Sequence, residues 1–200
     1  DNQFYSDEWA ELCVNLYYNG FLKHEYGYFP QCMSRYFFRN PDKLLEKIRG
    51  DDALYFEFQW YYRLPSEAFF DIGQLLHWTD VMINASDSDA DKVTLVGSIL
   101  GKAPDGDDGI FPIETVRKLL KIKKNEELTT AVARGKINSL GLRDVEDGKK
   151  EREKSDIYKM QARAMEIDYP QTSVILRILA NFYERESKRD QISSEIEPLQ

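Results

Sequence analysis

Apolar residues recur at helical spacing near the end of the chain, between Pro170 and Asp190. Pro170 suits the first turn of a helix, where the backbone N–H groups have no intrahelical acceptor. An apolar stripe on such a helix has to pack against another element. The pattern therefore predicts a helix over residues 170–190 with one buried face. The stripe consists of Val174, Ile175, Ile178, Leu179 and Phe182.

Similar periodicity, with proline, glycine and capping residues at the ends, predicts helices along most of the chain. Asn40 is the predicted N-cap of one of them, with Pro41 at its first helical position. Charges of both signs interleave over residues 149–167, which indicates a solvent-exposed surface with local ion pairs. The predicted helices cover residues 7–19, 30–38, 41–49, 67–83, 92–100, 112–124, 126–138, 149–167 and 170–190.

Residues 54–62 fit two patterns. Phe56, Phe58 and Trp60 alternate with polar residues as in a half-buried strand, whereas Leu54, Phe58 and Tyr62 also fit one face of a helix. A single strand without a partner strand would leave its backbone N–H and C=O groups unpaired. The helix is therefore preferred over the strand.

The predicted fold class is all-α, with the helices in an irregular bundle or in stacked antiparallel pairs, of which a solenoid is one form. Residues 103–109 combine proline, two glycines and three aspartates, a composition that favours turns. Asp105, Asp107 and Asp108 are interpreted as turn residues rather than metal ligands. The predicted organisation is an aromatic-rich helical unit over 1–103, a C-terminal helical unit over 104–190, and a disordered tail over 191–200, with one continuous domain as the alternative.

Composition restricts the classes of function. The chain has 200 residues, 42% of them hydrophobic, which indicates a globular protein with a core of its own. Its formal net charge of −8 argues against broad binding to nucleic acid or to an anionic membrane. No apolar run reaches the roughly 20 residues that span a bilayer, and no secretory leader opens the chain. We expect a cytoplasmic protein that does not associate with membranes.

One segment resembles the start of a calcium-binding loop. Asp87, Asp89 and Asp91 alternate as the first three oxygen ligands of such a loop do. The sixth position, which requires glycine for a sharp turn, is Lys92, and the twelfth, which should carry a bidentate carboxylate, is Ser98. An acidic loop that caps a helix is therefore preferred, and no metal ligand is assigned.

No catalytic or cofactor-binding residue is assigned either. His24 and His77 lack any local signature of a nucleophile or an orienting group. The chain contains no glycine-rich phosphate loop, nucleophile elbow or paired-cysteine zinc spacing. Cys13 and Cys32 lie in apolar and aromatic surroundings, so reduced, buried thiols are preferred over a disulfide or a metal site. The protein is expected not to be an enzyme and to require no cofactor.

Two interaction surfaces are considered. Basic side chains over residues 118–143 could contact phosphates if they converge, and Lys118, Lys121, Arg134 and Lys136 are the candidate nucleic-acid-binding residues of this alternative. Acidic neighbours favour an ordinary solvated surface instead. Aromatic residues are dense over residues 4–70, which favours a core of large side chains over a peptide groove. The preferred hypothesis is a non-catalytic protein-interaction or scaffold module. It docks a protein partner, or another domain of the same chain, through the last helix, with Phe182 and Tyr183 as candidate contacts.

Several segments of residues 100–190 resemble the C-terminal end of large, uncharacterised bacterial helical proteins. In that group the last helix starts as aromatic-Pro-Arg-Thr-Ala, where this chain has Gln171 and Ser173 at the third and fifth positions. The resemblance implies the C-terminal helical part of a larger intracellular bacterial protein and carries no known activity. The segments are Gly106-Asp-Asp-Gly-Ile-Phe-Pro-Ile-Glu-Thr-Val-Arg-Lys-Leu-Leu120, Glu127-Leu128, Asn138, and the run from Tyr169 to Glu186.

Overall fold

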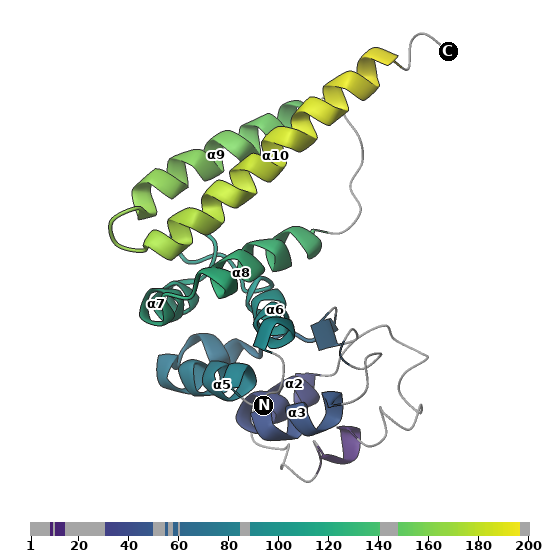
Figure 1. Ribbon diagram of the computed structural model, residues 1–200, viewed down its shortest axis with the longest axis vertical. Coiled ribbons are helices and arrows are strands. Elements are labelled where there is room, and N and C mark those ends of the chain that lie inside the picture. Colours follow the sequence, from purple (N-terminus) through teal and green to yellow (C-terminus); the bar gives the residue numbers. More distant parts are fainter. Residues whose placement is uncertain are drawn as a thin grey trace. The chain divides into compact units, whose positions relative to one another are not determined.

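The computed structural model describes residues 9, 11–14, 31–49, 55, 58–59, 61–84, 89–140 and 148–196 (Figure 1). Regular secondary structure in these residues is helical throughout, which confirms the all-α prediction. The chain forms two compact units, Asp1–Leu95 and Val96–Gln200. The division lies inside helix α6 (Asp89–Leu100) and not at residue 103, where the turn-rich segment had suggested it.

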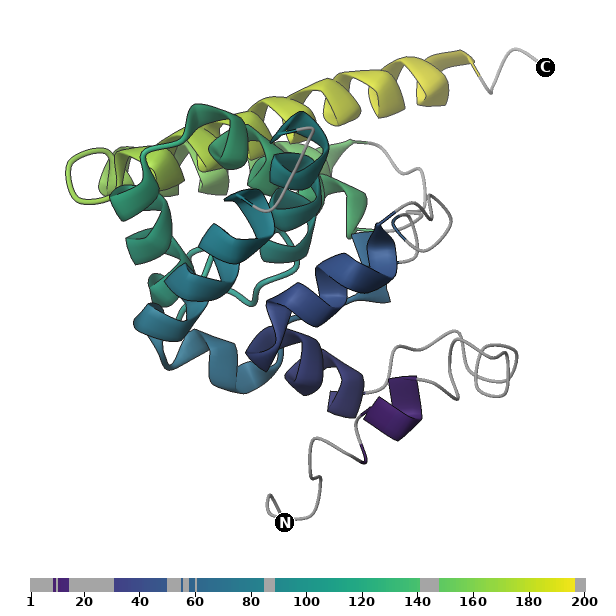
Figure 2. The same ribbon diagram turned by 60° about the horizontal axis from the view of Figure 1, so that its bottom comes forward.

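The first unit contains α2 (Gln31–Arg39), α3 (Pro41–Ile48), the short 3₁₀ helix η1 (Ser66–Phe69) and α5 (Ile72–Asn84). Figure 2 shows α2, α3 and α5 grouped together, and α3 contacts both α2 and α5. The single helix predicted over residues 67–83 is wrong, because the chain breaks between Phe69 and Ile72. Asp71 accounts for the break, since its carboxylate accepts a hydrogen bond from the backbone N–H of Gln74 (3.1 Å) and so caps a new helix.

Asn40 does not act as the predicted N-cap of α3. Its side chain makes no capping hydrogen bond to that helix. Instead its amide donates to the carbonyl oxygen of Tyr36 (3.0 Å), at the end of α2. Pro41 does open α3, as predicted. The asparagine therefore closes one helix rather than starting the next.

Large aromatic side chains fill the core of the first unit, as the preferred interpretation of the aromatic-rich segment expected. Phe37 and Phe58 meet edge to face with ring centroids 5.4 Å apart, and Tyr62 stacks on Trp78 at 6.5 Å. The Tyr62 hydroxyl donates to the carbonyl oxygen of Ser34 (3.1 Å), which satisfies the polar end of a fully buried ring. Burial raises the pKa of Tyr62.

The ambiguous segment 54–62 is helical where the structure describes it. Tyr55, Phe58, Gln59 and Tyr61 all have helical backbone, and the N–H of Tyr62 donates to the carbonyl oxygen of Phe58 (3.1 Å). This bond joins residues four apart, as in an α-helix. The helix was therefore the correct choice for these residues, and the rest of the segment lies outside the described part, as does most of the predicted helix over 7–19.

The second unit contains α7 (Glu114–Lys123), α8 (Glu126–Asn138), α9 (Lys149–Met165) and α10 (Pro170–Ile196). The long helix α10 is central to this unit, because it contacts α7, α8 and α9. Ile175 and Leu179 of its predicted stripe are fully buried, whereas Val174 is exposed. The predicted tail over 191–200 is partly wrong, since α10 continues to Ile196.

Glycines let α6 and α8 approach to backbone contact. A Cβ atom built on Gly97 would lie 2.7 Å from the backbone carbon of Ala131, and one built on Gly135 would lie 2.7 Å from the Cα atom of Ser98. Both distances are shorter than real Cβ contacts, and the obstructing atoms are main-chain atoms that cannot rotate away. The crossing therefore depends on glycine at these positions.

The helices α9 and α10 form an antiparallel hairpin, and α10 extends beyond the start of α9 (Figures 1 and 2). Small residues recur every seven positions along the contact. Three buried serine hydroxyls each donate to a carbonyl oxygen of the opposite helix or of the residue that precedes it. A hydroxyl bonded in this way satisfies its own polarity and allows close helix packing. The three bonds run from Ser155 to Ala180 (3.0 Å), from Ser173 to Ala162 (2.8 Å) and from Ser187 to Gly148 (2.7 Å).

Candidate functional site

The side of α9 that faces away from α10 carries a row of exposed apolar residues. Ile157, Met160 and Ile167 are 49%, 65% and 90% exposed, and Ala164 between them is exposed as well. Their spacing of three, four and three residues places them along one face of the helix, with Ile167 in the turn after it. We call these four residues the outer face of α9. A row of this kind is the seam that one helix presents to another.

Charged side chains border the outer face on both edges. Asp156 and Arg163 lie on one edge, and Lys154 and Asp168 lie on the other. Each of these residues is rotated about the helix axis from the apolar row by roughly the 100° that separates consecutive residues. All four are exposed. Of these four residues, one positive and one negative group lie on each edge.

The sequence interpretation missed this face. The interleaved charges over residues 149–167 were interpreted as a solvent-exposed surface, which is correct for most of the helix. Ile157, Met160, Ala164 and Ile167 nevertheless repeat at helical spacing within that charged background, and this spacing was the available signal. It becomes informative only once the opposite side of α9 is known to pack on α10.

A buried arginine fixes the turn-rich loop that precedes α7. Arg117 is 3% exposed, and its guanidinium donates to both carboxylate oxygens of Asp108 (2.6 and 2.7 Å). It also donates to the carbonyl oxygens of Ile110 (2.6 Å) and Pro112 (2.5 Å). The hydrogen bonds from Arg117 hold the pKa of Asp108 below its usual range. Arg117 is therefore an internal residue of the second unit, and Asp108 is a loop residue as expected.

Other helices hold the same loop. The side-chain amide of Gln161 on α9 donates to the carbonyl oxygen of Gly109 (3.1 Å). Lys136 on α8 lies over the ring of Phe111, with its Nζ atom 4.2 Å from the ring centroid, and pairs with Asp105 (3.4 Å). The loop is therefore a structural part of the second unit, and Asp105 and Asp108 are both engaged in ion pairs.

The four candidate nucleic-acid-binding residues do not have the same surroundings. Lys118 pairs with Glu114 (3.0 Å), and Lys121 lies over the ring of Tyr169 at 5.4 Å. Lys136 contacts the loop described above, and Arg134 is exposed on α8. Intramolecular contacts therefore engage three of the four cations, which weakens the interpretation that they form one phosphate-binding patch.

The two candidate partner-binding residues of the last helix are mostly internal. Tyr183 is 4% exposed and stacks on Tyr158 of α9, with ring centroids 5.7 Å apart. Lys154 lies over the ring of Tyr183 at 5.1 Å, and Phe182, which is half-buried, meets that ring edge to face. The structure thus corrects the expectation for Tyr183, which is buried against α9; of the predicted stripe on α10, Ile175 and Leu179 are buried and Val174 is exposed.

A shallow groove of about 330 Å³ runs along the hairpin. Its charged side chains mostly pair with one another, since Glu184 binds both Lys159 and Lys188 at 3.0 Å. These two lysines lower the pKa of Glu184 to about 2. The groove has no apolar wall of the kind that holds a small organic ligand. It is lined by Arg152, Ser155, Asp156, Lys159, Glu184, Ser187, Lys188 and Gln191.

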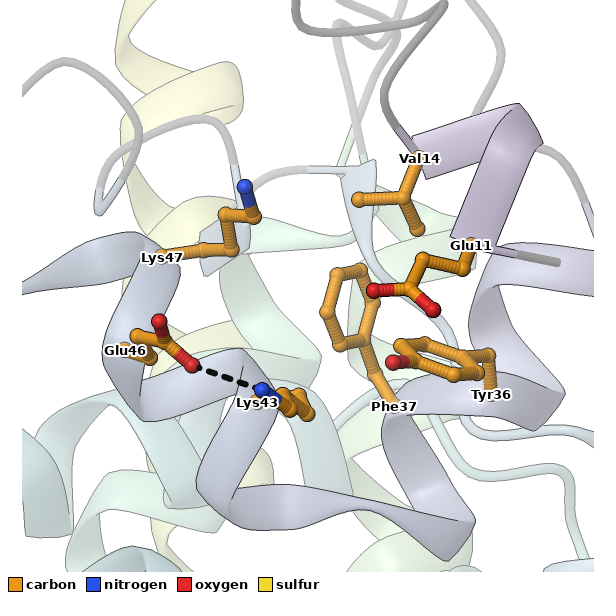
Figure 3. A pocket seen from close by; sticks show the side chains of 7 residues that line it. All are labelled: Glu11, Val14, Tyr36, Phe37, Lys43, Glu46 and Lys47. Carbon is orange, nitrogen blue, oxygen red and sulfur yellow. Dashed lines mark hydrogen bonds and ion pairs between the residues drawn. The ribbon is translucent and has the colours of Figure 1, made fainter. Parts of the chain in front are cut away.

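The first unit has a smaller hollow of about 70 Å³, shown in Figure 3. Glu11 and Val14 border it from the N-terminal helical residues, Tyr36 and Phe37 border it from α2, and three charged residues of α3 complete it. Two of these, Lys43 and Glu46, pair at 3.1 Å. Its volume is well below the roughly 300 Å³ of typical ligand pockets, so we assign no ligand to it.

The described residues contain no group of three or more His, Cys, Asp or Glu side chains placed to hold a metal ion. Asp89 and Asp91 of the calcium-like pattern belong to α6, while Asp87 lies outside the described part of the chain. His77 is exposed on α5, and His24 also lies outside the described residues. Within the same residues, the helices are too short or too polar for any of them to traverse a lipid bilayer.

Comparisons with protein-family models, with curated proteins and with solved structures find no match to this chain. The resemblance of residues 100–190 to large bacterial helical proteins therefore stays a prediction. Any proposal about function has to rest on the geometry of the chain itself.

Proposed function

We propose that the second unit is a non-catalytic protein-interaction module that docks through the outer face of α9, and that its partner is the same face of a second copy of the chain. The observation that best supports the proposal is the exposure of Ile157, Met160 and Ile167 in one row. Single exposed apolar residues are ordinary on protein surfaces, whereas a contiguous row is typical of an interaction site. The helical spacing of the row favours a helix as its ligand.

Charge complementarity is satisfied in an antiparallel arrangement of the two copies, which is the one we propose. If Ile157 of one copy faces Ile167 of the other, then Met160 faces Ala164. In this arrangement each edge of α9 lies beside the same edge of the second copy. Lys154 then lies near Asp168 of the second copy, and Asp156 lies on the same edge as Arg163 of the second copy. Two-fold symmetry repeats each opposite-charge pair.

In a parallel arrangement, opposite edges of the two helices would meet. Lys149 would then approach Lys154 of the second copy, but Lys154 would also lie near Asp156, and Arg163 near Asp168. The charges along α9 therefore permit either direction, and the charge exchange described below distinguishes the two.

The interface is small. Four residues of one helix cover less surface than the roughly 800 Å² per partner of a standard protein–protein interface. Surface ion pairs at the edges each add little free energy and mainly set orientation. We therefore expect a weak dimer that forms as the concentration rises. An irregular bundle of antiparallel helix pairs within each copy would hold α9 rigidly enough to present this face.

The first experiment is sedimentation velocity on the full chain, from about 1 μM to about 300 μM, a range suited to complexes of about 5–8 kcal/mol. We expect the weight-average sedimentation coefficient to rise with concentration toward that of a dimer. Met160→Lys should abolish the rise, because it places a charge at the centre of the face. Ile122→Lys on α7 is the matched control, since Ile122 is 59% exposed and lies outside the face. A wild-type chain that stays monomeric throughout would refute the proposal, as would equal loss of association in the control.

A charge exchange tests the arrangement. Lys154→Glu should weaken the dimer, because it faces Asp168 of the second copy, and adding Asp168→Lys in the same chain should restore it. In a parallel dimer the second substitution would instead bring a lysine near Arg163 and weaken association further. Circular dichroism of both variants checks that α9 remains helical, since Lys154 also contacts Tyr183.

A further inference from the structure

The two cysteines of the chain lie next to each other in the first unit. Cys13 belongs to the helical residues 11–14, and Cys32 lies in the first turn of α2. Figure 3 shows that these two segments face each other, with Glu11 and Val14 on one side and Tyr36 and Phe37 on the other. Both cysteines are free and half-buried, and Cys13 lies close enough to Cys32 to raise the pKa of its thiol. A small oxidant can therefore reach two thiols that lie near each other.

We propose that Cys13 and Cys32 are a redox-responsive pair that a peroxide or a small-molecule disulfide converts into an intramolecular disulfide. With hydrogen peroxide, one thiolate attacks a peroxide oxygen, which gives a sulfenic acid and, after protonation, one water. The second thiol then attacks the sulfenic sulfur, the S–S bond forms, and a second water leaves. The two thiols lose two protons and two electrons in total, and the peroxide gains them.

The environment makes this reaction slow and conditional. Burial, followed by the hydrogen bond and the charge of Cys13, raises the pKa of Cys32 from 9.0 to about 11. Only the thiolate is nucleophilic, so Cys32 is a poor attacking group at neutral pH. The pair should therefore stay reduced in a reducing compartment and respond to sustained rather than brief oxidation. This differs from the sequence-based preference for permanently reduced, buried thiols.

The bond would have a structural consequence in the first unit. It would join the N-terminal helical residues covalently to α2 beside the hollow of Figure 3. A cross-link across this segment removes conformations from the unfolded chain, which stabilises the folded state. The midpoint of thermal unfolding should rise on oxidation and fall again when dithiothreitol is added.

Peptide mapping of the full chain tests the proposal directly. After treatment with hydrogen peroxide, the intact mass should fall by two hydrogen atoms without a covalent dimer. Trypsin cleaves after Lys23 and Arg35, so Cys13 and Cys32 end in different peptides. Under non-reducing conditions these two peptides should appear as one cross-linked species that dithiothreitol separates. Recovery of both peptides as free thiols, sulfinic acids or intermolecular disulfides would overturn the proposal.

A second measurement separates native proximity from chance oxidation. In a glutathione redox buffer, the equilibrium ratio of disulfide to dithiol should be at least about tenfold higher for the folded chain than for the chain in urea, since folding holds the thiols together. An equal or lower ratio in the folded chain would contradict the inference. Cys13→Ser and Cys32→Ser are the controls, and neither should lose two hydrogen atoms.

Discussion

Replacing Asp108 by Asn separates the charge of the buried ion pair from its shape. The substitution keeps an oxygen that can still accept from the backbone N–H of Ile110, which Asp108 binds at 3.1 Å. It removes the negative charge that faces Arg117, whose side chain is 3% exposed. The guanidinium retains the carbonyl oxygens of Ile110 and Pro112 as acceptors but has no counter-ion left.

The size of the effect follows from which partner is buried. Leaving a fully buried charge without its partner costs about 3–5 kcal/mol. The carboxylate of Asp108 is 45% exposed, so water compensates for part of this loss. Two backbone acceptors remain as well. We expect Asp108→Asn to lower the free energy of unfolding by about 2–3 kcal/mol at neutral pH.

Urea denaturation monitored by circular dichroism measures this change, and Asp107→Asn provides the matched control. Asp107 is exposed in the same loop, and its substitution changes the net charge equally. We expect a change of no more than about 0.5 kcal/mol for the control. Equal effects of the two substitutions would show that net charge, and not the contact with Arg117, determines the stability of the loop.

The pH dependence gives an independent check. Arg117 lowers the pKa of Asp108 below 3.8 in the folded state, so the contribution of the carboxylate is present above 3.8 and is lost as the pH falls through the lower folded-state value. The difference between the wild type and Asp108→Asn should therefore be constant near neutrality and should shrink below pH 3.8. A difference that is unchanged at acid pH would refute the argument.

Three further predictions concern packing and titration. Gly135→Ala should destabilise the second unit by about 1–3 kcal/mol in a denaturation experiment, because the new Cβ atom meets the backbone of α6. Gly73→Ala is the control. Its new Cβ atom meets only a side-chain atom at 3.3 Å, so this substitution should be neutral or stabilising. Ser173→Ala should cost about 1 kcal/mol by the same assay, since it removes the buried hydrogen bond to Ala162; no change in unfolding midpoint would argue against that bond. Alkylation of Cys32 by iodoacetamide should be slow at pH 8 and accelerate toward pH 11, because its pKa is raised from 9.0 to about 11. The stability that the neutral thiol contributes to the folded state should fall as the pH rises through the same interval. An alkylation rate that levels off near pH 9 would contradict the raised pKa.

Much of the fold follows from local patterns. Pro41 and Pro170 mark helix starts correctly, because proline is favoured where the first N–H groups lack acceptors. The failures occur where a side chain chooses between two local bonds. Asp71 starts a new helix inside a predicted one, and Asn40 bonds backward to Tyr36 instead of forward to α3. Sequence alone does not determine which backbone group such a side chain will contact.

The candidate site was harder to predict for a different reason. Phe182 and Tyr183 look suitable for docking on an isolated helix, but α9 covers Tyr183 in the folded unit. Arg117 looks like one more surface cation until the loop that contains Asp108 folds over it. Exposure is a property of the assembled helices, so a sequence pattern indicates which residues share a face but not which face remains uncovered.

The seven-residue repeat along the hairpin has a consequence for how this fold can change in length. The three serine bonds step forward by seven residues on α9 and backward by seven on α10, and small residues occupy the contact at every step. A deletion or insertion of seven residues in both helices would keep the small residues opposite one another, whereas a change of one or two residues would rotate them away from the contact. The hairpin can therefore lengthen or shorten by whole heptads with the same contact between its two helices.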